Sequence, residues 1–178
     1  MRESELVRSL RQVRNFSDQA IPDDVLLDIL NVGRWTGSSK NSQPWDLIVV
    51  QKRETLAALS KLGQFAGHVA GAKLGIGLVM HGKDDWTLMD EGRLMQNIML
   101  AAWANGVGSG IGSIYPDDNE EHAKVLLGIP KEHSLRTVLS IGYPENPEAL
   151  RLPPTARSRG RRPLENVVSW ERLGNHSH

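Results

Sequence analysis

One long amphipathic segment constrains the fold of this 178-residue chain more than any other feature. From about residue 88 to residue 105, the apolar residues Leu94, Ile98, Met99 and Ala102 recur at the spacing of one helix face. Gly106 follows as a helix stop signal. This pattern predicts the longest helix of the chain, and we expect it to be the central one.

Shorter helices and strands alternate around this segment without an internal repeat. The second predicted helix opens at Pro22, and its buried stripe should consist of Val25, Leu26, Ile29, Leu30 and Val32. The periodicity predicts further helices over residues 4–13, 53–62 and 120–127, buried strands over 47–50, 74–80 and 136–142, and a helix or strand over 164–173.

Three or four short strands with helices between and around them indicate an α+β or three-layer α/β domain. The first strand is not followed by the G-x-G-x-x-G of a simple nucleotide-binding fold, since the glycines of residues 106–112 fall at every second position. We expect one domain over residues 1–178. Residues 145–178 should form an extended C-terminal arm, because prolines and arginines gather in its first half.

The composition excludes several classes of chemistry. The chain has no cysteine, which rules out disulfides, zinc-thiolate sites, iron–sulfur clusters and thiol nucleophiles. Any redox chemistry must therefore use a bound cofactor. The 21 basic and 21 acidic residues cancel, which argues against a general nucleic-acid or membrane-surface binder. The N-terminus lacks the apolar core of a signal peptide, so we expect a cytoplasmic location.

The histidines and serines form no familiar catalytic pattern. The six histidines are scattered without metal-ligand spacing, so no metal site is expected. No G-x-S-x-G nucleophile elbow is present, which disfavours a serine hydrolase.

Residues 36–45 (TGSSKNSQPW) form the most informative segment. They place six hydroxyl or amide side chains between a predicted helix and a predicted strand. Because such groups both donate and accept hydrogen bonds, they could bind a polar heteroaromatic ring or a ribityl chain. The same residue types are also those of an ordinary capped turn, and composition alone leaves both interpretations open.

The full string SSxNSQPW followed by an apolar strand closely resembles the flavin-binding signature of the nitroreductase family. Four further segments match that family in order along the chain. They are the N-terminal element at residues 11–16, the central helix and glycine turn at residues 90–109, the LGIP of residues 127–130 and the GYP of residues 142–144.

The resemblance implies a three-layer α/β/α fold with a central, mostly antiparallel sheet, and a homodimer with the flavin at its interface. It also implies an FMN-dependent enzyme that takes hydride from NADH or NADPH and passes it to a nitroaromatic, a quinone or a similar small acceptor. No side chain need serve as acid, base or nucleophile, because the flavin carries the chemistry.

The family resemblance also assigns cofactor-binding residues. Ser38, Ser39 and Asn41 would contact FMN from the neighbouring subunit, while Arg14 would lie beside the N1–C2=O edge, where a cation favours reduction. Leu10 and Gln12 depart from the family's arginine and serine, which leaves a phosphate contact to be taken over. Arg11, Arg159 and Arg161 are the candidates for the phosphate contact, and Gln12 is also assigned to the cofactor site. Ile111, Gly112 and Ser113 are assigned to the flavin N5 side.

Other interpretations stay open at this point. The chain could store or deliver FMN without turning it over. The arginines of residues 151–162 could form a solvated tail or a nucleic-acid contact, Arg14 could be a surface residue, and the glycines near residue 110 could be a flexible turn.

Overall fold

The structure is a computed structural model that describes residues 3–148 and 161–176. It divides into two units, Met1–Glu145 and Asn146–His178. In the second unit, residues Leu164–Asn166 form a short 3-10 turn, η4, in place of the helix or strand predicted over residues 164–173. All the strands described below belong to the first unit.

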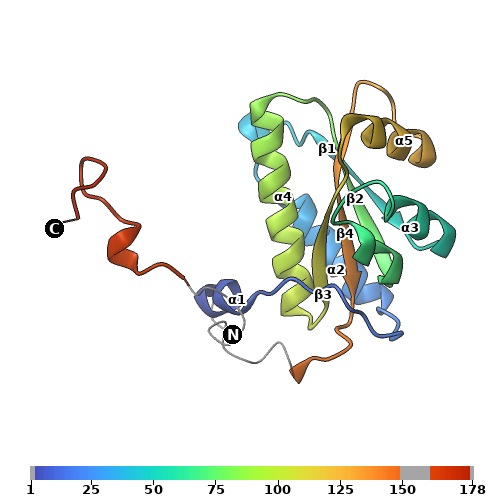
Figure 1. The fold of residues 1–178 in the computed structure, drawn as a ribbon, viewed down its shortest axis with the longest axis horizontal. Helices are drawn as coiled ribbons and strands as arrows, with labels where there is room; N and C mark the ends of the chain where they lie inside the picture. The colour runs from blue at the N-terminus through green and yellow to red at the C-terminus, as the bar shows by residue number, and fades with distance from the viewer. Residues whose placement is uncertain (1–2, 149–160, 177–178) are drawn as a thin grey trace. The chain divides into compact units, whose positions relative to one another are not determined.

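A four-stranded sheet forms the centre of the first unit (Figure 1). Its strands are β1 (Trp45–Val50), β2 (Leu74–Met80), β3 (Gly108–Ser113) and β4 (Ser134–Gly142). The order is β1-β2-β4-β3, and every neighbouring pair is antiparallel. Strands β1 and β3 are therefore the edges, and the predicted antiparallel sheet is confirmed.

Helices cover both faces of this sheet. On one face, α2 (Asp23–Arg34) and α4 (Asp85–Ala104) pack with Ile76, Leu78 and Leu139 of the central strands. On the other face lie α3 (Arg53–Leu59), the 3-10 turn η2 (Gly67–Gly71) and α5 (Asp117–Leu127), which pack with Val79 and Val138. The chain thus has the predicted α+β class in three α/β/α layers.

The predicted central helix is confirmed as α4, which begins slightly earlier than expected. Asp84 caps it, because its carboxylate accepts a hydrogen bond from the Thr87 N–H at 3.0 Å. Leu94 and Ile98 on its buried face are fully enclosed. None of the helices in the described part of the chain is both long and apolar enough to span a membrane.

Three local predictions were wrong. Helix α1 (Glu3–Ser9) ends well before residue 13, because Val13 donates its N–H to Ser109 O of β3 at 2.8 Å. Val32 is exposed, since Gly33 follows Ile29 on the buried face of α2 and packs closely on Ile98. Val49 is also exposed, because β1 is an edge strand and not a fully buried one.

Candidate functional site

The N-terminal segment, residues 11–16, lies along the edge of β3 that faces away from β4. Gln12 pairs with Ser109 as a parallel bridge, and Phe16 pairs with Pro144 beyond the end of β4. The segment crosses the sheet below the middle of α4 in Figure 1, where it is drawn in blue. The predicted site residues of the N-terminus and of β3 are thus brought together.

The hydrogen bonds show which main-chain groups of β3 point outward. Ile114 donates to Arg136 O at 2.8 Å, so alternate residues of this strand bond to β4. Ser109 and Ile111 therefore direct their main-chain groups to the opposite edge. There, the Ile111 N–H has the Gln12 side-chain oxygen at 3.5 Å, the long limit of a hydrogen bond. The structure thus presents the Ile111 N–H at an edge beside Gln12.

The glycines of β3 serve packing within the chain. A Cβ on Gly110 would lie 2.5 Å from Val13 O, and one on Gly112 would lie 2.8 Å from a Val69 methyl. Gly112 is buried, whereas Ile111 is half-buried and Ser113 is exposed. The glycines therefore admit the N-terminal segment and η2, and the outward main-chain groups belong to the residues between them.

His68 of η2 contacts the same edge. Its Nε2 lies 3.1 Å from Ile111 O, and its Nδ1 lies 2.8 Å from Ser140 Oγ. Burial lowers the pKa of His68, the hydrogen bond to Ile111 opposes that shift, and the nearby positive charge of Arg14 adds to it. Arg14 is itself exposed. A cation, an amide side chain and an outward N–H thus share one edge of the sheet.

Arg11 makes contacts with its own helix. Its Nη1 donates to Arg8 O and to Leu10 O, each at 2.9 Å, at the end of α1. Such contacts satisfy carbonyls that a helix C-terminus leaves open.

The polar loop, residues 36–45, is anchored by two hydrogen bonds and has left-handed backbone conformations at its centre. Asn97 of α4 donates to Thr36 Oγ1 at 2.8 Å, and Ser38 Oγ accepts from the Gln43 N–H at 2.8 Å. The turn η1 (Ser39–Asn41) contains Lys40 with φ 52° and Asn41 with φ 55°, and Gln43 has φ 48°. Left-handed conformations at residues other than glycine cost about 1 kcal/mol each and cluster at functional sites.

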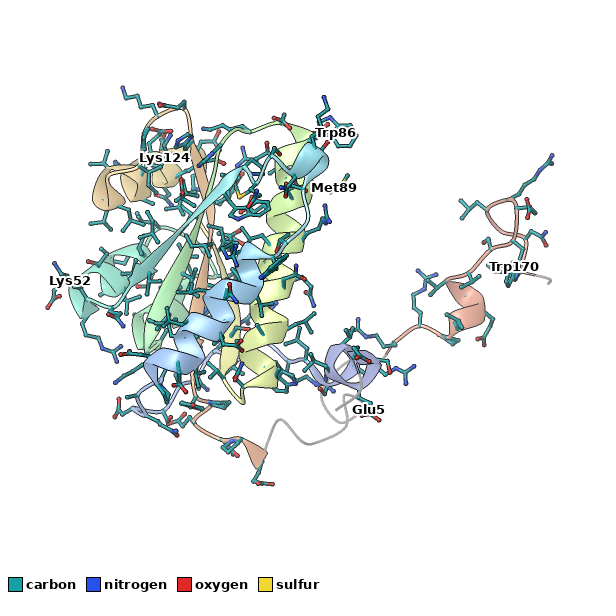
Figure 2. All side chains as sticks on the ribbon, turned by 180° about the vertical axis from the view of Figure 1, so that it is seen from behind. Glu5, Lys52, Trp86, Met89, Lys124 and Trp170 are labelled. Carbon is teal, nitrogen blue, oxygen red and sulfur yellow. The ribbon has the colours of Figure 1, made fainter. Side chains whose placement is uncertain are left out.

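The loop and the β3 edge lie apart in one chain. Turn η1 is beside the N-terminal end of α4, whereas the N-terminal segment crosses nearer its other end (Figures 1 and 2). Trp86 and Met89 project outward from the same end of α4 as η1, and they are 70% and 56% exposed. The structure therefore does not bring Ser38, Ser39 and Asn41 to Arg14 within one subunit.

The two C-terminal arginines of the prediction belong to the second unit. Arg161 is exposed there, and Arg159 lies outside the described residues.

A profile of the nitroreductase family matches residues 7–67 and 76–143, a span that includes the polar loop, the N-terminal segment and β3. The chain belongs to the nitroreductase family. This confirms the family resemblance and the predicted enzyme class, a nitroreductase-type oxidoreductase.

Individual relatives agree with this membership. A protein of Archaeoglobus fulgidus named "Putative NADH dehydrogenase/NAD(P)H nitroreductase" is 32% identical over 148 residues, which cover 79% of this chain and 84% of the relative. A solved structure named as an FMN-dependent nitroreductase from Clostridium difficile has a TM-score of 0.74 at 25% identity, over 79% of this chain and 87% of that one.

A more distant structure shares the fold alone. The NADPH:FMN oxidoreductase of Vibrio harveyi, solved with NAD+, has a TM-score of 0.79 at 20% identity, and the match covers 95% of this chain and 76% of that one.

Sequence reasoning on this nitroreductase missed His68 and Ser140. His68 belongs to no recognisable motif. Ser140 carried a usable signal, because it is a polar residue in the middle of an apolar strand, and such residues need a partner when they are buried.

Proposed function

We propose that the protein is an FMN-dependent oxidoreductase that uses NADH or NADPH to reduce a small acceptor such as a nitroaromatic or a quinone. The observation that carries this proposal is the outer edge of β3, where the Ile111 N–H points outward beside Gln12 and Arg14. The names of the relatives, one FMN-dependent and others NAD(P)H-linked, support the cofactor and the electron donor.

The donors at this edge match the chemistry of a flavin ring. The N5 atom of an oxidised flavin accepts a hydrogen bond, which the Ile111 N–H can donate. Negative charge develops at the N1–C2=O edge on reduction, and the Arg14 guanidinium would stabilise it. FMN, when bound, supplies the hydride-transfer chemistry, and the protein supplies orientation and charge.

The remaining predicted residues complete the proposed site. Gly112 and Ser113 would continue the main-chain surface on the N5 side, with Gly112 setting how closely η2 approaches. Gln12 would contact the ring beside Ile111. Arg11, Arg159 and Arg161 would bind the phosphate, for which guanidinium groups are well shaped.

We propose that the site is shared across a homodimer, with Ser38, Ser39 and Asn41 reaching FMN from the other subunit. Two observations support this. The polar loop lies away from Arg14 in its own chain, and large apolar side chains, Trp86 among them, are exposed on the same end of α4. An exposed apolar group of this kind is typical of a protein interface. The predicted cytoplasmic location stays a prediction.

Anaerobic titration tests the proposed function. Protein freed of cofactor is mixed with FMN, and the complex is then mixed with NADH or NADPH while flavin absorbance is followed. We expect FMN to bind, at least one nicotinamide to bleach the flavin, and a nitroaromatic or quinone to restore its colour. Absence of FMN binding would overturn the proposal, and binding without bleaching would favour a storage protein.

Surface-cation variants locate the binding site. Arg14→Ala should weaken FMN binding by about tenfold, the effect of losing one charge-assisted contact. Lys52→Ala, at an exposed position before α3 (Figure 2), should leave it unchanged.

A further inference from the structure

The imidazole of His68 is held on both sides. Nε2 faces Ile111 O at 3.1 Å, and Nδ1 faces Ser140 Oγ at 2.8 Å. Ser140 is fully buried, and its hydroxyl also lies 3.2 Å from Gly110 O. The ring therefore connects η2 to the edge of β3 and to the interior of β4.

The hydrogens of this cluster can be assigned from its acceptors. A carbonyl oxygen only accepts, so Nε2 must carry a hydrogen to bond Ile111 O. The Ser140 hydroxyl has one hydrogen and two acceptors within reach, Nδ1 of His68 and Gly110 O. Because burial lowers the pKa of His68, the neutral ring is favoured, and the hydroxyl then donates to Nδ1. Ser140 thereby fixes the Nε2–H tautomer that Ile111 requires.

Ile111 lies where its main chain depends on contacts other than those with β4. Its N–H and C=O both point away from β4, at an edge where the described residues add no further strand to the sheet. At one end of this edge, the Val13 N–H of the N-terminal segment donates to Ser109 O. Past the other end of β3, the Tyr115 N–H donates to Leu62 O. Between these two points, His68 bonds the Ile111 carbonyl, and the Gln12 side chain approaches the Ile111 N–H at 3.5 Å.

We propose that His68, oriented by Ser140, is a positioning residue that fixes the Ile111 main chain for its contact with the flavin. The ring holds the carbonyl of Ile111 while the N–H of the same residue stays directed toward the cofactor. This inference rests on the proposed function, since it takes FMN as the ligand of that N–H.

Four variants test the role of His68. His68→Leu removes the donor to Ile111, His68→Gln keeps an N–H donor at the end of a side chain of similar reach, and Ser140→Ala removes the orienting hydroxyl. His122→Gln, at an exposed position on α5, is the matched control. The measurements are the FMN dissociation constant, from quenching of flavin fluorescence, and the midpoint potential of the bound flavin. Circular dichroism melts verify folding.

We expect His68→Leu to raise the FMN dissociation constant by about five- to tenfold, the effect of one lost hydrogen bond, and to shift the midpoint potential. Ser140→Ala should act in the same direction with a smaller effect. His68→Gln should recover most of the wild-type affinity and potential, and His122→Gln should match wild type.

The outcomes separate the two proposals. If wild type binds FMN and folded His68→Leu and Ser140→Ala behave like the control, the positioning role is overturned while the proposed function stands. Equal losses in His68→Gln and His68→Leu would also overturn it, since ring packing would then be the cause. If His68→Leu does not fold, Ser140→Ala and His68→Gln decide by the same criteria. Failure of wild type to bind FMN would overturn both proposals.

Discussion

At the scale of single residues, Glu91 of α4 is a buried carboxyl group that the proposed chemistry does not use. It is 6% exposed, and its Oε1 has no hydrogen-bond partner among the described residues. Burial raises the pKa of Glu91, although a hydrogen bond from Thr137 and the charge of Arg136 oppose that shift. The fold therefore favours the protonated acid relative to the unfolded chain.

The pH dependence of Glu91 follows from this raised pKa. Its contribution to stability is fully present below the pKa of the unfolded chain and is lost as the pH rises through the folded pKa. Glu91→Gln, which does not titrate, should therefore gain stability relative to wild type between pH 5 and pH 8. The gain should amount to about 1.4 kcal/mol for each pH unit by which the folded pKa exceeds the unfolded one.

Thermal melts at several pH values measure this difference. Glu132→Gln, at an exposed position before β4, serves as the control and should not reproduce the trend. A constant difference between Glu91→Gln and wild type over this pH range would contradict the prediction.

The predictability of the candidate site differs from residue to residue. Arg14 and Gln12 could be proposed because they lie in a motif of contiguous residues. The fold places Gln12 beside Ile111 and Arg14 near His68, while their contacts with a cofactor stay a prediction. His68 could not be found in this way. Its partners Ile111 and Ser140 are 43 and 72 residues away along the chain, so only the three-dimensional packing reveals its role.

At the scale of elements, β2 and α4 were predictable and β3 was not. Strand β2 shows its burial through an uninterrupted run containing Ile76, Leu78 and Val79, and its predicted bounds are confirmed. Strand β3 reads GSGIGS, and glycine is depleted in strands. Because its glycines make room for neighbouring segments, the signal for this strand lies in tertiary packing and not in its own residues.

The packing on β3 predicts how the strand responds to an added methyl group. Gly110→Ala should destabilise the protein by about 2 kcal/mol, because its Cβ would lie 2.5 Å from Val13 O and 3.1 Å from the His68 ring. The N-terminal segment must then move off the strand. Chemical unfolding measures the loss, and hydrogen exchange at Val13 should increase with it.

Gly71→Ala is the matched control for this element. Gly71 lies in η2, is exposed, and has no atom within 4 Å of an added Cβ. We expect a change of no more than about 0.5 kcal/mol. Equal stabilities of the two variants would show that the N-terminal segment does not press on β3.

At the scale of the whole molecule, the polar loop and the β3 edge lie apart in one chain, which makes it difficult for both to contact the same flavin. The two groups that the family resemblance assigns to one flavin lie near different ends of α4 (Figure 1). The strained loop around Asn41 is also anchored to α4 through Thr36 and Asn97, which opposes its movement toward Arg14. A second copy of the chain resolves the problem if it supplies the loop.

Mixed dimers distinguish a shared site from a site within one chain. If Arg14 and Asn41 of the partner subunit serve the same flavin, a dimer of an Arg14→Ala chain with an Asn41→Ala chain keeps one intact site of two. A dimer of wild type with the double variant Arg14→Ala/Asn41→Ala then keeps none. A site within one chain gives the reverse result. Each dimer thus controls for the other, with identical substitutions in total.

The measurement is the number of FMN molecules bound per dimer, followed by turnover with a nicotinamide. Chains that carry different affinity tags allow the mixed dimers to be purified from the parental ones. We expect about one FMN per dimer bound with wild-type affinity for the pair of single variants, and none bound with wild-type affinity for wild type paired with the double variant, whose sites should bind about tenfold more weakly. Arg14 and Asn41 are both exposed, so both variants should fold, with a cost of about 1 kcal/mol at Asn41, where alanine tolerates the left-handed backbone less well than asparagine. If instead wild type paired with the double variant binds one FMN with wild-type affinity and the pair of single variants binds none in this way, the loop and the β3 edge contact the same flavin within one chain.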